Sequence, residues 1–310
     1  MAEILVIGSF VMDNVARMQK MPEIGETVIG TGIELSPGGK GINQCVAISR
    51  LGGKTEMIGM LGNDASGETF KKIMKDEKIK CDNVFSCDKP TATAQIQIDA
   101  EGRNRICVIP SANHELGFEH LDRIDGQIKN ASLLVLQLEL RIDVTMEIIR
   151  RAHAYGTKIL LNPAPAVKLD AEILKMVDYV TPNETELSIL TDMPTDTDEE
   201  VKKAAKKLLS IGAKTVIATL GGRGALIATD DICEIVGGYS VTAIDTVAAG
   251  DSFNGAFAVA LTEGADLSSA VKFANAMGAL TVTRKGAISS LHTRDEVESF
   301  MASNAQKKEI

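Results

Sequence analysis

Short apolar runs alternate with longer amphipathic stretches along most of this chain. The runs have the length of buried strands, and the stretches repeat apolar residues with the spacing of a helix. We expect strands at residues 4–7, 56–60, 133–138, 159–161, 179–181 and 215–218, and helices at residues 41–50, 67–74, 144–153, 185–190, 199–209, 251–261 and 267–282. Strands that alternate with helices predict βαβ units, so the expected fold class is α/β with a mostly parallel sheet.

Residues 93–110 break this rhythm. Ala94, Ile96 and Ile98 alternate with polar residues, and the alternation resumes after a glycine-containing turn. This pattern predicts an antiparallel hairpin with one apolar face. With residues 27–35, the hairpin is expected to form a small sheet that projects from the main body. A lid function or a dimer contact would cover the apolar face, and a plain surface appendage is the alternative.

Composition restricts the function classes. The net charge of −9 and the dispersed Lys and Arg residues argue against a nucleic-acid partner. No apolar run approaches the roughly 18 residues of a membrane span, and no basic leader precedes the first strand, so we expect a cytoplasmic protein. The 5 cysteines include no CxxC pair, which favours reduced thiols. A length of 310 residues fits one large α/β unit or a main domain with an appendage.

Polar residues follow several of the expected strands. Asp13 comes after the first run, Glu139 after the run at 133–138, and Asn162 after the run at 159–161. Asn183 and Glu186 follow the run at 179–181. Because ligands of open parallel sheets bind beyond the carboxyl ends of the strands, these side chains predict a polar site at that edge.

The segment 245–253 carries the most specific chemistry. A turn of small residues leads into a helix, so the N–H groups of Ala248, Ala249 and Gly250 are expected to be free donors at the positive end of the helix dipole. Asp251 would then stand beside a bound phosphoryl group as a base. The alternative is that Asp251 serves as the N-cap of the helix.

Two glycine-rich turns complete the candidate site. Residues 38–43 open the first long helix and permit a close approach of backbone to a ligand. Residues 219–224 are expected either to wrap a nucleotide or to join two strands as a tight hairpin. Neither turn is a Walker A motif, and no GxGxxG follows the first strand.

These motifs together resemble the ribokinase family of carbohydrate kinases, also called the PfkB family. Residues 38–44 are similar to its N-terminal signature, 183–186 to its NxxE motif and 245–251 to its C-terminal signature. The resemblance runs nearly end to end. It implies a single ribokinase-like domain over 1–310, with a doubly wound sheet flanked by helices. It also implies a β-sheet lid formed by about 12–37 and 93–110.

The resemblance implies phosphoryl transfer from ATP to a sugar, with Asp251 as the base and Ala248, Ala249 and Gly250 as the anion hole. The implied sugar contacts are Val11, Asp13, Gly39, Asn43, Glu139 and Asp251. The implied ATP contacts are Asn183, Glu186, Thr219, Leu220, Gly221, Gly222, Arg223, Gly224, Gly250 and Asn275, the first two acting on the Mg²⁺-bound phosphates through water. A K⁺ or similar ion is implied at Asp245, Val247, Thr281, Arg284, Gly286 and Ser290. Arg284 is otherwise part of a solvated helix end.

Val11 departs from the ribokinase pattern, which usually has Asn at this position. Valine forms no hydrogen bond with a sugar hydroxyl, so it suits a substrate with hydrogen at that carbon. We therefore expect 2-deoxyribose, with ribose also used because an apolar pocket rejects an added hydroxyl weakly. The alternatives are that Val11 only packs, that the acceptor is fructose or adenosine, and that the chain is a noncatalytic sensor. A homodimer through the lid sheets is expected.

Overall fold

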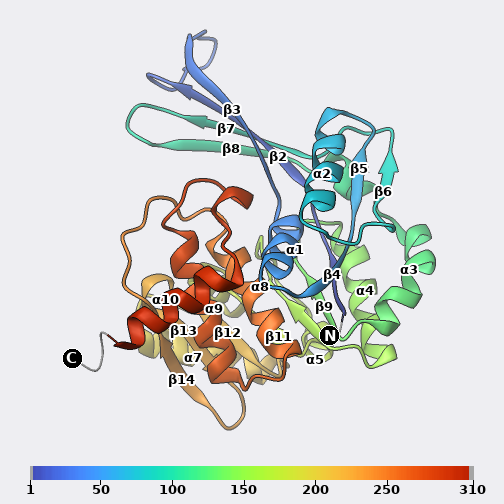
Figure 1. The fold of residues 1–310 in the computed structure, drawn as a ribbon, viewed down its shortest axis with the longest axis vertical. Coiled ribbons are helices and arrows are strands. Elements are labelled where there is room, and N and C mark those ends of the chain that lie inside the picture. The colour runs from blue at the N-terminus through green and yellow to red at the C-terminus, as the bar shows by residue number, and fades with distance from the viewer. Residues whose placement is uncertain (1–2, 307–310) are drawn as a thin grey trace.

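The computed structural model describes residues 3–306 and contains an eight-stranded sheet with the order β14-β13-β12-β11-β10-β9-β1-β4 (Figure 1). The six strands from β4 to β12 in this order run parallel, and β13 and β14 join antiparallel at one edge. The strands are β1 (Glu3–Ile7), β4 (Lys54–Ile58), β9 (Leu133–Leu136), β10 (Ile159–Leu161), β11 (Tyr179–Val180), β12 (Val216–Thr219), β13 (Gly224–Ala228) and β14 (Cys233–Gly237). The predicted mostly parallel sheet is therefore confirmed.

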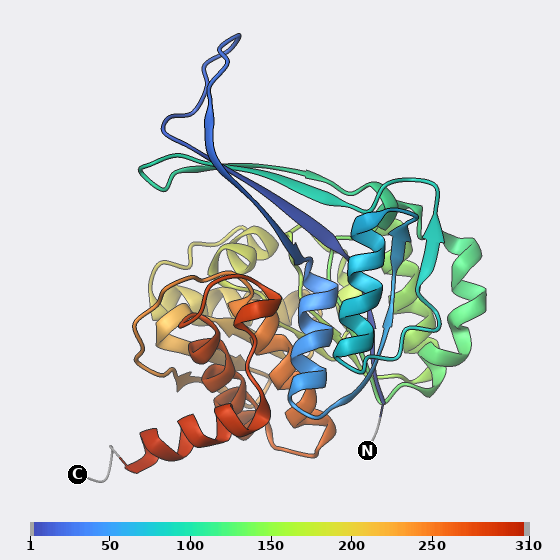
Figure 2. The ribbon, with the colours of Figure 1, turned by 45° about the horizontal axis from the view of Figure 1, so that its top comes forward.

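Helices cover both faces of this sheet (Figure 2). Because side chains alternate along a strand, Ile4 and Val6 of β1 belong to one apolar core, and Leu5 and Ile7 belong to the other. The first core includes residues of α1 (Lys40–Arg50), α2 (Ala65–Asp76), α8 (Ala249–Thr262), α9 (Leu267–Thr281) and α10 (Arg294–Gln306). The second includes residues of α3 (Phe118–Asn130), α4 (Ile142–Tyr155), α5 (Ala171–Met176), α6 (Glu184–Thr191) and α7 (Asp198–Ile211). The fold is doubly wound, as expected.

A second sheet projects from the main body (Figures 1 and 2). It has the order β3-β2-β7-β8. Its strands are β2 (Val11–Met18), β3 (Gly30–Gly38), β7 (Thr93–Ile98) and β8 (Asn104–Ile109). We call it the small sheet. The predicted hairpin corresponds to β7 and β8. The strand expected at 27–35 instead begins at Gly30 and ends at Gly38, and β2 was not predicted.

The small sheet has exposed apolar side chains on both faces, whereas one apolar face was expected. Strand register places Ile106 and Val108 on the same face as Asp13, because Val108 pairs with Ala94 and Ala94 pairs with Asp13. Ile33 lies on the opposite face, through its pairing with Ala16. Strand β3 places its apolar residues on the face where β7 places its polar residues. Both faces of the small sheet therefore carry apolar side chains.

The remaining differences from the expected elements are small. The run at 56–60 divides into β4 and the short strand β5 (Met60–Gly62), which pairs with β6 (Phe85–Cys87). Helices α3, α5 and α10 were not among the predicted elements. Three 3₁₀ turns complete the structure: η1 (Ser111–Glu115), η2 (Gly221–Arg223) and η3 (Ile288–Ser290). Within residues 3–306, no helix is both long and apolar enough to span a membrane.

Candidate active site

The carboxyl ends of β10, β11 and β12 meet the first turns of α1, α6 and α8 around a cavity of about 190 Å³. We call it the phosphoryl cavity because the first turns of three helices surround it, and helix N-termini favour the binding of phosphoryl groups. Its lining residues are Lys40, Asn162, Thr181, Asn183, Glu186, Thr219, Thr246, Ala248, Ala249, Gly250, Asp251 and Asn254. The cavity lies beyond the carboxyl ends of the strands, which is the edge predicted from polar residues such as Asn162, Asn183 and Glu186.

Helix α8 begins at Ala249, and its N-cap is Ala248 in the left-handed conformation, with φ of 60°. A non-glycine residue pays a conformational cost there, and such residues cluster at functional sites. Asp251 lies in the first turn rather than at the cap, so the N-cap interpretation of Asp251 is wrong. The N–H of Ala249, which was expected to be a free donor, instead donates a long hydrogen bond of 3.3 Å to the carbonyl of Thr246, because the turn before α8 closes on itself there.

Two amide side chains from α1 hold the buried carboxylate of Asp251. Its Oδ2 accepts a hydrogen bond of 2.9 Å from Asn43 Nδ2, and its Oδ1 accepts one of 3.1 Å from Gln44 Nε2. The Oδ1 atom of Asn43 is buried without a hydrogen-bond partner among residues 3–306. A buried acceptor without a partner is costly, so this atom is available for a ligand that donates a hydrogen bond.

Lys40 lies among the carboxylates of Glu139, Glu186 and Asp251. Burial alone would lower the pKa of Lys40, but the three negative charges outweigh that effect and raise it. Burial raises the pKa of Glu186, while the N–H of Asn183 and the charge of Lys40 oppose that change. The site therefore places a lysine of raised pKa beside three carboxylates, one of which, Glu186, also has a raised pKa.

Asp13 and Glu139 approach the same site from the small sheet and from the loop after β9. Burial, and secondly the negative charge of Glu139, raise the pKa of Asp13 to about 6. Glu139 Oε2 accepts hydrogen bonds from Ser9 Oγ and from the backbone N–H of Lys40, the latter at 2.9 Å. These contacts tie the glycine-rich turn before α1 to Glu139.

Gly39 is required by the path of that turn. Its φ is 104°, which side chains rarely adopt, and a Cβ atom added to it would lie 2.7 Å from the backbone nitrogen of Val11. Val11 is two residues before Asp13 in β2, so their side chains project from the same face of the strand. Val11 is buried against Ala92 and Ala94. These contacts support the alternative that Val11 only packs. The effect of Val11 on the choice of sugar stays a prediction.

A second cavity, of about 550 Å³, adjoins the phosphoryl cavity. We call it the nucleotide cavity. Its lining residues are Thr219, Gly221, Gly222, Gly224, Gly238, Tyr239, Ser240, Val241, Ala243, Thr246, Ala249, Gly250, Phe253, Asn275, Gly278, Ala279 and Val282. Four of them also line the phosphoryl cavity: Thr219, Thr246, Ala249 and Gly250. The two spaces therefore meet at the start of α8.

The turn at 219–224 both joins the antiparallel strands β12 and β13 and lines the nucleotide cavity. Two of its residues are not among those lining the cavity. Leu220 is buried, and Arg223 forms ion pairs with Glu184 and Asp198 on α6 and α7. Asn275 donates a 3.0 Å hydrogen bond to the carbonyl of Val236 at the cavity wall.

Asn183 and Glu186 form a capping box at the start of α6. Asn183 Oδ1 accepts a 2.8 Å hydrogen bond from the N–H of Glu186, and Glu186 Oε2 accepts one of 2.8 Å from the N–H of Asn183. The NxxE spacing thus has a structural role in addition to any role toward a ligand. Both residues line the phosphoryl cavity.

The segments 245–247 and 281–290 lie side by side, joined by Asp245. Asp245 Oδ2 accepts a 2.9 Å hydrogen bond from the N–H of Gly286, and its Oδ1 accepts one of 3.1 Å from Val247. The hydroxyl group of Thr281 donates to the carbonyl of Met277, and that of Ser290 donates to the carbonyl of Ala287. Of the residues implied for a monovalent cation, these contacts therefore link Asp245, Val247 and Gly286.

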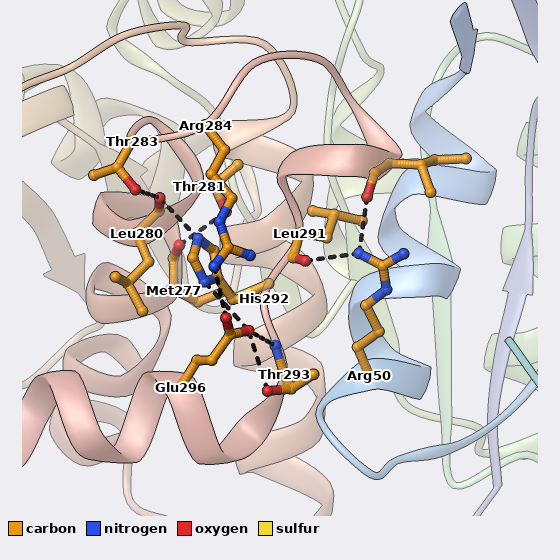
Figure 3. Close-up of polar contacts among 11 residues, drawn as sticks. Arg50, Met277, Leu280, Thr281, Thr283, Arg284, Leu291, His292, Thr293 and Glu296 are labelled. Carbon is orange, nitrogen blue, oxygen red and sulfur yellow. Dashed lines mark hydrogen bonds and ion pairs between the residues drawn. The ribbon is translucent and has the colours of Figure 1, made fainter.

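Side chains on both sides brace the loop between α9 and α10 (Figure 3). Arg50 of α1 donates to the carbonyls of Ile288 and Leu291, at 2.9 and 2.6 Å. On the other side, Arg284 pairs with Glu296 at 2.6 Å, and its side chain is 46% exposed, which agrees with the alternative of a solvated helix end.

The sequence profile of the pfkB family carbohydrate kinases matches residues 1–294. The chain belongs to this family. The kinase is 37% identical over 297 residues to a ribokinase of Haemophilus influenzae, which covers 96% of this chain and 97% of the relative. It is 34% identical over 311 residues to a deoxyribokinase of Salmonella typhi, which covers 97% and 99%.

Among solved structures, a ribokinase of Arabidopsis thaliana complexed with ribose and ATP superposes on the kinase with a TM-score of 0.89. The two are 30% identical, and the match covers 96% of this chain and 98% of the other. The expected ribokinase-like fold is confirmed, and the chain is a sugar kinase. The sensor alternative is not favoured.

Sequence reasoning about the kinase missed several residues of the site. Lys40 lies inside the N-terminal signature but was given no role, although its side chain stands among three carboxylates. Thr181, Thr246 and Asn254 line the phosphoryl cavity. Thr181 directly follows β11, but the predicted strand at 179–181 included it, so the rule that located Asn162 did not single it out. Asn254 is on α8, one turn after Gly250, and helical spacing was the available signal.

Proposed function

We propose that this kinase transfers the γ-phosphate of ATP to the primary 5-hydroxyl of a pentose, either 2-deoxyribose or ribose. The observation that carries the proposal is the position of Asp251. Its carboxylate is held by Asn43 and Gln44 in the first turn of α8, where the phosphoryl and nucleotide cavities meet. The similarity to a ribokinase and a deoxyribokinase at full length supports the choice of sugar class.

In the proposed reaction, Asp251 accepts the proton of the 5-hydroxyl as its oxygen attacks the γ-phosphorus. The new O–P bond forms while the bond from the γ-phosphorus to the bridging oxygen of ADP breaks. The N–H groups at the start of α8 and the ammonium group of Lys40 stabilise negative charge on the transferring phosphoryl group. The reaction needs positioning and charge stabilisation, and these groups provide both.

Four side chains are assigned to the sugar. Asn43 Oδ1 is the buried acceptor without a partner, which suits a hydroxyl donor. Asp13 and Glu139 supply carboxylate acceptors at the same end of the site. Val11 would face the carbon at which ribose carries a hydroxyl and deoxyribose carries hydrogen, which is the basis for expecting deoxyribose.

The phosphoryl cavity suits Mg²⁺ bound with the ATP phosphates. Asn183, Glu186 and Thr219 offer oxygen donors, and Mg²⁺ prefers oxygen ligands and retained water. Triphosphate beside the carboxylates of Glu186 and Asp251 would otherwise concentrate negative charge. When bound, Mg²⁺ neutralises charge on the β- and γ-phosphates.

A K⁺ or similar ion is proposed between the segments 245–247 and 281–290. Asp245 and nearby carbonyl groups supply the hard oxygen donors that such an ion prefers, and Asp245 already links the two segments through Val247 and Gly286. When bound, the ion strengthens this link. The chain's own residues thereby hold the turn that leads into α8.

We infer a homodimer formed through the small sheet, which also acts as a lid. Ile106 and Val108 are each 57% exposed on the face that carries Asp13, and a second copy of that face would cover them. The 5 cysteines, all free, support a reducing compartment such as the cytoplasm.

The test is ADP release measured with ribose, 2-deoxyribose, fructose and adenosine. We expect turnover with both pentoses, with deoxyribose at least equal to ribose in kcat/KM. Val11→Asn should shift that ratio toward ribose by about tenfold because it adds a hydrogen-bonding partner for the extra hydroxyl. Preference for fructose or adenosine would overturn the pentose assignment, and an unchanged ratio in V11N would overturn the role of Val11.

A further inference from the structure

A continuous set of buried hydrogen bonds links the carboxylate of Asp251 to the peptide of Gly250. We call this set the amide relay. Its members are Gln137, Gln44, Asn162, Thr181 and Asn254, whose side chains are buried. They come from α1, from α8 and from the carboxyl ends of the neighbouring strands β9, β10 and β11. Of these side chains, only Gln44, which holds the Asp251 carboxylate, has entered the description of the reaction above.

The relay begins at Gln44, which uses both of its N–H donors. Gln44 Nε2 donates to Asp251 Oδ1 at 3.1 Å and to Asn162 Oδ1 at 3.2 Å. Its Oε1 accepts a 2.7 Å hydrogen bond from Gln137 Nε2. If the Gln44 amide were rotated by 180°, its oxygen would face the Oδ1 atoms of Asp251 and Asn162. Its nitrogen would face Gln137 Nε2. The surroundings therefore fix a direction in which Gln44 donates to Asp251.

From Asn162 the relay continues to the first turn of α8. Asn162 Nδ2 donates to the carbonyl of Thr181 at 3.1 Å, and Thr181 Oγ1 donates to Asn254 Oδ1 at 2.5 Å. Asn254 Nδ2 then donates to the carbonyl of Gly250 at 2.8 Å. The Gly250 carbonyl and the Asp251 N–H belong to one planar peptide, so a hydrogen bond that holds the oxygen also sets the direction of the N–H.

We propose that Gln44 is a positioning residue for phosphoryl transfer, and that the amide relay fixes the Asp251 carboxylate relative to the peptide donors at the start of α8. The proposal rests on the proposed role of Asp251 as the base. The carboxylate of Asp251 can rotate about two side-chain bonds, and hydrogen bonds to both of its oxygens restrict that rotation. Asn43 supplies one of these bonds beside the sugar, whereas Gln44 supplies the other from the protein interior.

The first experiment replaces Gln44 with methionine, which keeps the length of the side chain and removes its donors. We expect kcat to fall by about 10- to 100-fold, while the KM for sugar changes less than threefold, because misplacement of a reacting group acts on the transition state. Gln137→Met is the matched control one step farther along the relay. It leaves the Gln44 donors in place, so its loss of kcat should be clearly smaller.

The second experiment is a double-mutant cycle between Q44M and Asp251→Asn. If Gln44 acts through Asp251, Q44M should slow the D251N enzyme less than threefold, although it slows the wild type strongly. Equal fractional losses in both backgrounds would overturn the proposal, and so would an unchanged kcat in Q44M. High activity of D251N itself would instead overturn the proposed base, so the two failures are distinguishable.

Circular dichroism and sugar binding check that each variant is folded. If Q44M does not fold, Thr181→Val tests the far end of the relay, since valine keeps the shape of threonine and removes its donor. We expect kcat of T181V to fall about three- to tenfold with unchanged sugar affinity. An unchanged kcat in folded T181V would overturn the part of the proposal that concerns the Gly250 peptide.

Discussion

At the scale of single residues, we expect the ionisation of Asp13 to make sugar binding depend on pH. Its pKa is raised to about 6 by burial and then by Glu139. A raised carboxyl pKa means that Asp13 is ionised only above about pH 6 and loses its acceptor character as pH falls below that value. We expect kcat/KM for the sugar to decrease below about pH 6, because this parameter reports ionisations of the free enzyme and free substrate.

Glu139→Gln supplies the control for this profile. The substitution removes a negative charge that raises the pKa of Asp13, so the acid limb of kcat/KM should move to lower pH. The level of kcat/KM should also fall, since Glu139 is assigned to the sugar. A limb that stays in place in E139Q, measured from pH 5 to 8, would show that another group controls the profile.

Replacing Gly250 with alanine should lower activity without lowering stability. A Cβ atom added there meets no atom within 4 Å of the described chain, yet Gly250 lines both cavities where they meet. We expect Gly250→Ala to keep the thermal unfolding midpoint within about 2 °C while kcat falls at least about tenfold, because the methyl group occupies ligand space.

Gly126→Ala in α3 is the matched control, since its added Cβ is also free of contacts within 4 Å. Alanine in a helix interior is favoured over glycine by roughly 0.5–1 kcal/mol. G126A should therefore be slightly more stable and fully active. Loss of activity in both variants would point to a general effect of the substitution rather than to crowding of the site.

Asp251 shows what a sequence motif can and cannot predict. The segment 245–251 correctly predicted a turn that leads into a helix with Asp251 in its first turn, but whether Asp251 is the N-cap depended on the φ of Ala248. Alanine rarely adopts a left-handed conformation, so local sequence did not predict it. The amide relay was not predicted either. Gln44 and Asn254 are more than two hundred residues apart, and amides carry no spacing signature.

At the scale of elements, α10 braces the loop that follows α9 through Glu296 (Figure 3). Hydrogen bonds from Thr293 and then from Arg284 lower the pKa of Glu296 to about 2. His292 lies beside it, with Nδ1 3.4 Å from Glu296 Oε2. Burial, and then the charge of Arg284, lower the pKa of His292. This element boundary therefore favours an ionised Glu296 and a neutral His292 near neutral pH.

Glu296→Gln should lower the thermal unfolding midpoint at pH 7 by about 2 °C, a modest value because the pair with Arg284 is partly exposed and screened by solvent. A lowered carboxyl pKa contributes stability that is present above the unfolded value of 4.5 and is lost as pH falls toward about 2. The difference between wild type and E296Q should therefore shrink below pH 4.5.

Glu298→Gln is the control for this comparison, since Glu298 is an exposed neighbour on α10 that contacts Arg294 at 3.4 Å. Its midpoint should stay close to that of the wild type at every pH. If E296Q and E298Q behave alike, general surface charge rather than the Glu296 contacts determines the stability of this boundary.

Elements with clear periodicity were predicted well, and those that depend on tertiary pairing were not. The strand β10 was predicted with its observed bounds, because its apolar run is too short for a helix and is flanked by polar residues. The strand β2 was missed because its sequence, VMDNVARM, mixes charged and apolar residues without strict alternation. It is a strand because β3 and β7 pair with it on both sides.

At the scale of the whole molecule, the small sheet is expected to determine the oligomeric state. Ile106→Glu should convert the dimer to a monomer in sedimentation or light scattering, because it places a charge in the face that carries Asp13. Ile33→Glu is the control on the opposite face, and Ile33 is 80% exposed. A dimer that survives I106E but not I33E would assign the interface to the other face. A monomeric wild type would refute the dimer.

The small sheet also carries part of the proposed sugar site: Asp13 lies within β2, and Gly39 directly follows the last residue of β3. Any displacement of the sheet therefore displaces sugar contacts. Thermodynamic reciprocity requires that a bound sugar bias the position of the sheet as strongly as the sheet biases the affinity for sugar. Without sugar, that bias is missing, so we expect the γ-phosphate to be less completely enclosed. The enzyme should therefore hydrolyse ATP to water only slowly when no acceptor is bound, which limits futile consumption of nucleotide.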